Sequence, residues 1–161
     1  AYSLKGLRFK EIPVLDSITS SIHFVGPLVY ALSLLGFPAE AWPFVIAFFL
    51  WGVASQAFGA VQDILPDREA NIRSIATIFG ARNTVWFAFV NYLACVIIIF
   101  TQSVVTPIIG LALIAYLANI APFLSVTDKS SALTRTGWKR FLWINYLVGA
   151  IITISIIAQQ L

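Results

Sequence analysis

Long apolar runs alternate with short polar connectors along the whole chain. Each run approaches the roughly 20 residues that a helix needs to cross a bilayer, and each is apolar on all sides. The runs are too long for buried strands, and the alternating segments of about ten residues that build a membrane barrel are absent. The pattern predicts an all-α, polytopic transmembrane bundle of five helices. The expected spans are residues 15–35, 43–62, 85–101, 106–126 and 138–158, the third beginning as a helix near Ser74.

Composition supports membrane embedding. The 161 residues are 60% hydrophobic and only 11% charged, which is unlike a soluble domain. The single cysteine, Cys95, lies in an apolar run and supports neither a disulfide nor a cysteine metal site. Methionine is absent, so we expect this sequence to be part of a longer chain.

The basic residues fall in three connectors that five spans place on one side of the membrane. The connectors at residues 36–42 and 102–107 carry none of them. By the positive-inside rule the basic connectors and residue 1 are cytoplasmic, as expected for an integral protein of the cell membrane. The basic residues are Lys5, Arg8 and Lys10, then Arg68, Arg73 and Arg82, then Lys129, Arg135, Lys139 and Arg140.

The connector after the second span also concentrates acidic groups. It reads VQDILPDREANIRSIATIFGARNT and places Asp63 and Asp67 four residues apart. On a helix the two carboxylates would share one face, with Pro66 in its first turn; alternatively the pair lies on a loop before a helix starting near Asp67. Paired carboxylates suit Mg²⁺, which often shares its ligand shell with substrate phosphates. The competing interpretation is a solvated loop whose carboxylates balance the arginines.

Carboxylates and basic groups on one membrane face together suit a metal-bridged diphosphate. A prenyl diphosphate would place its phosphates at this surface and its apolar tail between helices. Aromatic rings near the spans would be available to stabilise an allylic carbocation. The small residues of the second span, including Gly52 and Gly59, favour close helix packing or leave room for an isoprenoid chain. No catalytic triad, zinc pattern or glycine-rich phosphate loop is present.

These segments resemble the UbiA-type intramembrane prenyltransferases. QDILPDREANIRSIATIFGARNT is similar to the second aspartate-rich motif of that family, and YSLKGLRFKEIPVLDSI is similar to the basic connector before its fifth transmembrane helix. The resemblance implies a fold of nine transmembrane helices around a lipid-accessible cavity. Residues 1–161 would be the C-terminal part of one such domain, supplying helices five to nine.

The resemblance also implies a site. Asp63 and Asp67 match the second motif, as catalytic residues and ligands of Mg²⁺. Tyr2, Arg8, Lys10 and Arg68 are the implied diphosphate-binding residues. The family's first aspartate-rich motif and its N-terminal helices are absent here, so the piece alone is expected to be inactive.

The sequences of these segments most resemble those of the carotenoid-modifying, lycopene elongase-like members of the family. That implies transfer of a prenyl group from an allylic diphosphate to a lipophilic acceptor such as lycopene. Quinone-pathway and archaeal lipid-ether prenyltransferases stay open as alternatives. From other classes, a transporter or channel fragment and a non-catalytic membrane scaffold also stay open. The expected partners are prenyl diphosphate, the acceptor and the lipid bilayer, with no nucleic acid.

Overall fold

The chain folds into long helices with no strand among the residues that the structure describes. The computed structural model describes residues 12–102 and 106–158. This confirms the all-α prediction. The elements are α1 (Leu15–Leu34), α2 (Trp42–Val61), α3 (Ile64–Glu69), α4 (Ile75–Phe100), α5 (Thr106–Ile120) and α6 (Thr134–Ala158), with short 3₁₀ turns at Ala39–Ala41, Ala121–Phe123 and Asp128–Leu133.

Four of the expected spans have the length and apolarity to cross a membrane. They are Leu15–Leu34, Ala39–Val61, Ile75–Phe100 and Asp128–Ala158, whereas Pro107–Phe123 is a shorter apolar helix. Together they make the chain an integral membrane protein with a polytopic helical bundle. The fourth expected span, residues 106–126, is therefore present as an apolar helix but is shorter than the others within the described residues.

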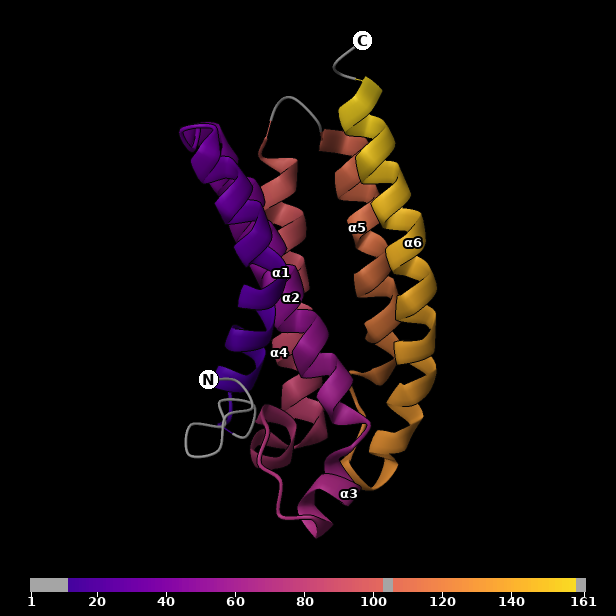
Figure 1. Ribbon diagram of the computed structural model, residues 1–161. Coiled ribbons are helices and arrows are strands. Elements are labelled where there is room, and N and C mark those ends of the chain that lie inside the picture. The colour runs from indigo at the N-terminus through magenta and orange to yellow at the C-terminus, as the bar shows by residue number, and fades with distance from the viewer. Residues whose placement is uncertain (1–11, 103–105, 159–161) are drawn as a thin grey trace.

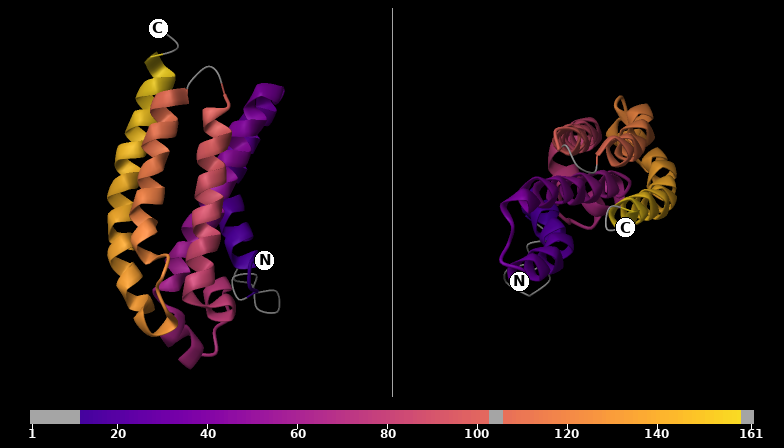
Figure 2. Two further views of the ribbon diagram at one scale, coloured as in Figure 1. Left: turned by 180° about the vertical axis from the view of Figure 1, so that it is seen from behind. Right: turned by 90° about the horizontal axis from the view of Figure 1, so that it is seen from above.

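The long helices alternate in direction and pack in chain order. Figure 1 shows α1, α4 and α6 running one way and α2 and α5 the other, with α3 at one end of the bundle. Each long helix packs against the next one in the chain: α1 against α2, α2 against α4, α4 against α5, and α5 against α6. The helix α2 also contacts α6. Viewed from above, these helices form a curved layer (Figure 2). The residues 62–74 and 124–133 therefore lie at the same end, called here the connector end.

Small residues of α2 let neighbouring helices approach closely. A β-carbon added to Gly52 would collide with Ser21 of α1, and one added to Gly59 would lie 3.0 Å from the indole of Trp138 on α6. Ser21 also donates a hydrogen bond of 2.6 Å to the carbonyl of Phe49. The packing interpretation of these glycines is confirmed. The room beside Gly52 is taken by Ser21. The alternative of space for an isoprenoid chain beside this helix stays a prediction.

The helix α4 begins where the sequence predicted and then breaks once. Ser74 caps it: the Ser74 hydroxyl accepts from the amide of Thr77, and the Thr77 hydroxyl accepts from the amide of Ser74 at 2.8 Å. Such reciprocal capping satisfies two amides that the first turn leaves without helical partners. Gly80 then interrupts the helix with φ 78° and ψ 166°. The broken first turn stands beside α3 and shapes the connector end.

Candidate functional site

The two aspartates of the connector lie one turn apart around a short helix. Asp63 is the residue before α3, and the Asp67 amide donates to the Asp63 carbonyl at 2.9 Å. Pro66 occupies the first turn, where a missing amide hydrogen costs nothing. The shared-face prediction is thus confirmed, and the alternative of a loop ending near Asp67 is wrong. Asp63 is exposed and Asp67 is half-buried.

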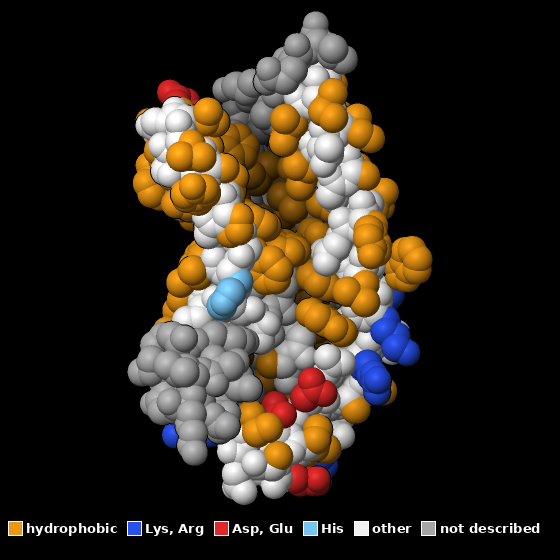
Figure 3. Space-filling view, viewed as in Figure 1, with side chains coloured by type: hydrophobic (Ala, Val, Ile, Leu, Met, Phe, Trp, Pro, Cys, Tyr) orange, Lys and Arg blue, Asp and Glu red, His pale blue; other side chains and the backbone are white. Residues whose placement is uncertain are grey.

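Both carboxylates line a polar pocket of about 340 Å³ at the connector end. Figure 3 shows acidic side chains at the lower end of a hollow that is apolar above them. Residues from α1, α2, α6 and the segments that flank α3 complete the described wall, so the pocket gathers elements far apart in sequence. These residues are Asp16, Gln56, Gly59, Ala60, Gln62, Ile72, Ser74 and Trp138.

The electrostatics of the pair favour a bound cation. The pKa of the Asp67 carboxyl lies above its usual value, first because burial disfavours the charged form and then because Asp63 is nearby. A divalent cation between them would remove that repulsion. No group of three or more His, Cys, Asp or Glu side chains suited to a metal occurs among the described residues. Two carboxylates nevertheless fit Mg²⁺, which keeps waters and takes phosphate oxygens as further ligands.

A third carboxylate in the pocket wall has a structural role. Asp16 is only 2% exposed, and its two oxygens accept hydrogen bonds from the Ser17 amide at 2.7 Å and from the Ile75 amide at 3.2 Å. It therefore ties the start of α1 to the first turn of α4. Asp16 is the second residue of the first expected span, residues 15–35. A lone carboxylate in an apolar run is the signal that could have found it.

Arg68 makes a network that links three segments of the connector end. Its Nη1 donates to Asp128 Oδ2 at 2.7 Å, and its Nε and Nη2 donate to the Thr77 carbonyl at 3.1 and 2.9 Å. Asp128 Oδ1 in turn accepts from the Ala81 amide at 2.7 Å, beyond the break at Gly80. We call these contacts the Arg68–Asp128 clamp.

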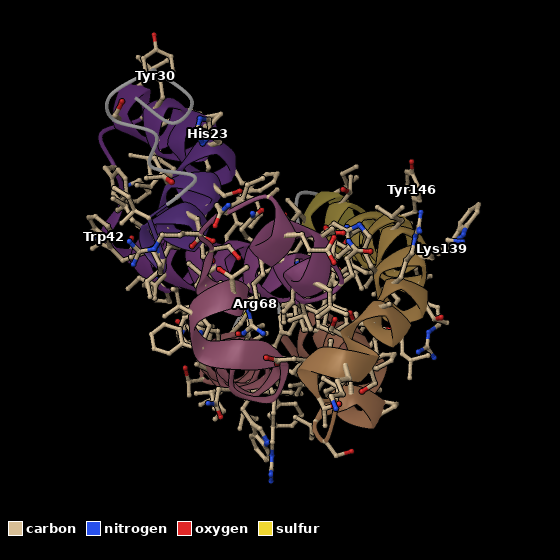
Figure 4. The ribbon with its side chains drawn as sticks, turned by 90° about the horizontal axis from the view of Figure 1, so that it is seen from below. His23, Tyr30, Trp42, Arg68, Lys139 and Tyr146 are labelled. Atoms are coloured by element: carbon tan, nitrogen blue, oxygen red, sulfur yellow. The ribbon has the colours of Figure 1, made fainter. Side chains whose placement is uncertain are left out.

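The hydrogen bonds of the clamp occupy the Arg68 guanidinium within the protein. Arg68 is not in the described lining of the polar pocket. In Figure 4, which views the bundle from below, Arg68 lies near the centre of the lower end, whereas Lys139 projects outward from α6. The diphosphate-binding role of Arg68 stays a prediction. In the described structure, Arg68 holds α3 in place through the Arg68–Asp128 clamp. Tyr2, Arg8 and Lys10, the other predicted diphosphate-binding residues, lie outside the described residues.

We expect alanine at Gly80 to destabilise the Arg68–Asp128 clamp. A backbone with φ 78° and ψ 166° is open almost only to glycine, and a β-carbon there would lie 3.1 Å from Asp128 Oδ1. Gly80→Ala should therefore lower the unfolding free energy of the purified full-length protein by about 1–3 kcal/mol, seen as a lower thermal midpoint. Gly26→Ala is the control, because Gly26 is helical with nothing within 4 Å of the added carbon. Equal midpoints for the two variants would contradict the strain assigned to Gly80.

A larger apolar pocket of about 660 Å³ lies farther along the bundle. It is bounded by α1, α2, α4, α5 and α6, and Asn145 is the one amide side chain in its described wall. Asn145 Oδ1 accepts a hydrogen bond of 2.8 Å from the Tyr116 hydroxyl, so this oxygen has a partner within the protein. A pocket of this size and character suits a hydrocarbon chain.

Comparison with known proteins gives one family match. The sequence model described as the UbiA prenyltransferase family matches residues 1–145. No solved structure matches the chain.

The similar curated proteins are concerned with carotenoids. The chain is 49% identical over 157 residues to the C(50) beta-cyclic carotenoids biosynthesis protein LbtBC of Dietzia sp., covering 95% of this chain and 36% of that protein. It is 46% identical over 160 residues to a lycopene elongase/hydratase of Corynebacterium glutamicum, covering 98% of this chain and 56% of that protein. A lycopene elongase/hydratase of Haloferax volcanii is 30% identical over 157 residues, covering 96% of this chain and 48% of that protein. The chain thus spans about a third to a little over half of these relatives.

Proposed function

Because the chain belongs to the UbiA prenyltransferase family, we propose that the full-length protein transfers a prenyl group from an allylic prenyl diphosphate to a lipophilic acceptor. The observation that carries the proposal is the polar pocket holding Asp63 and Asp67 at one end of a membrane bundle, with an apolar pocket beyond it. A substrate with a charged head and a hydrocarbon body requires both environments.

We propose Mg²⁺ as the cofactor and Asp63 and Asp67 as its ligands from this chain. When bound, Mg²⁺ would supply positive charge that stabilises the diphosphate leaving group. The carboxylates hold the charged head at the connector end, while the apolar wall excludes water from the reacting carbon. We place the connector end on the cytoplasmic side, since the basic residues of the two described connectors, including Arg68, Arg73 and Lys129, lie there.

For the acceptor we propose a carotenoid such as lycopene. Two of the relatives compared above are named lycopene elongase/hydratase, and the region in which each is similar to this chain covers nearly the whole of this chain. The apolar pocket, with a volume of about 660 Å³, would hold only the end of such a long molecule, and the remainder would extend into the bilayer.

The test is prenyl transfer by the full-length protein in membranes. Membranes containing it are incubated with Mg²⁺, a labelled five-carbon allylic diphosphate and lycopene, and the products are separated by chromatography. We expect label in a lengthened carotenoid and none in membranes without the protein. Transfer to a quinone precursor or a lipid ether instead would move the protein to another branch of the family. Absence of transfer to any of these acceptors, with the protein intact, would contradict the proposal.

A further inference from the structure

Trp138 lies at the junction between the two pockets. Its indole lines the polar pocket together with Asp63 and Asp67. Its Cη2 and Cζ3 press against α2 at Gly59, where a β-carbon would be only 3.0 Å away. Gly59 is four residues before Asp63, which corresponds to about 6 Å along a helix axis. The ring therefore contacts α2 within its last turn, whereas Asp63 comes after the end of that helix.

A chain of ring contacts connects Trp138 to the apolar pocket. Trp138 stacks on Phe141, with centroids 4.8 Å apart and an interplanar angle of 11°. Phe141 in turn lies 6.0 Å from Trp51 and 5.7 Å from Tyr116, and these last two rings line the apolar pocket. Phe141 thus covers one face of the Trp138 indole, while the same side chain lines the polar pocket.

The chemistry required at this depth is stabilisation of a hydrocarbon cation. A diphosphate held at Asp63 and Asp67 would put the first carbons of its prenyl chain about one turn inward. An allylic carbocation cannot be stabilised by accepting hydrogen bonds. The electron-rich face of an aromatic ring attracts cations, and tryptophan does so more strongly than tyrosine or phenylalanine. Trp138 is the one aromatic side chain among the described residues that line the polar pocket.

We propose that Trp138 is a catalytic residue of the transfer, with its indole face stabilising the allylic carbocation; this rests on the proposed function. The bond between the first prenyl carbon and the diphosphate oxygen breaks, and its electron pair leaves with the diphosphate. The double bond of the acceptor then supplies the electron pair for the new carbon–carbon bond. The acceptor cation that results loses a proton, for which the released diphosphate is an available base.

The decisive experiment varies the electron density of this ring and leaves its shape nearly constant. Tryptophan analogues with one, two and three ring fluorines are placed at position 138 of the full-length protein. Each fluorine withdraws electron density from the face of the indole, so we expect kcat to fall stepwise, by about tenfold over the series, with KM for the prenyl diphosphate unchanged. The same series at Trp143, which is 76% exposed on α6, should leave kcat unchanged. A flat series at position 138 would overturn the proposal.

Ordinary substitutions give an independent measurement. Trp138→Phe keeps an aromatic face and should retain more activity than Trp138→Leu, which keeps only apolar bulk. Equal kcat values for these two variants, both correctly folded, would overturn the proposal. A flat fluorotryptophan series together with an inactive Asp63→Ala protein would reject the role of Trp138 and leave the proposed function standing. A wild-type protein that transfers no prenyl group would reject both.

Discussion

Alanine in place of Asp63 or Asp67 is expected to lower kcat for prenyl transfer by about 100- to 1,000-fold, the usual loss when a group that stabilises charge in the transition state is removed. Both carboxylates line the polar pocket, and either single variant would leave Mg²⁺ with one ligand from this helix. The loss should be measured in the full-length protein at limiting Mg²⁺, with the amount of folded protein checked by size exclusion.

Glu69→Ala is the matched control for this pair. Glu69 is an exposed carboxylate at the end of the same short helix, and it is not among the described residues lining the pocket. Its removal changes the net charge of α3 by the same amount as either aspartate variant, so it should leave kcat within about twofold if only general charge effects act. Normal prenyl transfer by Asp63→Ala or Asp67→Ala would reject the role assigned to that residue.

Breaking the Arg68–Asp128 clamp is expected to have the second largest effect. Arg68→Ala removes three donated hydrogen bonds that hold α3 against α4 and against the turn at Asp128. A displacement of the carboxylate pair by about 1 Å would cost on the order of 100-fold in kcat. Lys139→Ala is the control, because Lys139 is an exposed cation that points away from the bundle.

A double-mutant cycle separates the clamp from direct contact with diphosphate. If Arg68 acts through Asp128, then Asp128→Ala should lower kcat in the same way, and the double variant should be little worse than either single variant. If Arg68 instead contacts the diphosphate, Arg68→Ala should mainly raise KM for the prenyl diphosphate, and Asp128→Ala should leave activity nearly intact. The second pattern would contradict the clamp.

Local patterns in the sequence were sufficient to predict the helical fold and the common face of Asp63 and Asp67. Apolar run length predicted the helices, and the i, i+4 spacing of Asp63 and Asp67 predicted their common face, because both depend on neighbours within one or two turns. The start of α4 at Ser74 follows from the same kind of local signal, a capping residue.

The remainder of the site depends on contacts between distant segments. Arg68 and Asp128 are separated by 60 residues, and Asp16 and Ile75 by 59, so no spacing rule could pair them. Its position relative to the expected spans puts Trp138, like Trp42 and Trp86, near a predicted membrane interface, where amphipathic rings are favoured. The latter two are indeed exposed, but Trp138 turns into the polar pocket because Gly59 on another helix leaves space for its ring.

Manganese binding tests the central claim most directly. Mn²⁺ is a spectroscopic substitute for Mg²⁺ at oxygen ligands, and its free concentration can be followed by electron paramagnetic resonance in the purified full-length protein. We predict that an unreactive prenyl thiodiphosphate tightens Mn²⁺ binding by at least about tenfold, as expected for two ligands with linked sites. We also predict that this tightening is lost in the Asp63→Asn/Asp67→Asn double variant. Equal tightening in the folded double variant would show that the diphosphate and its metal are held elsewhere.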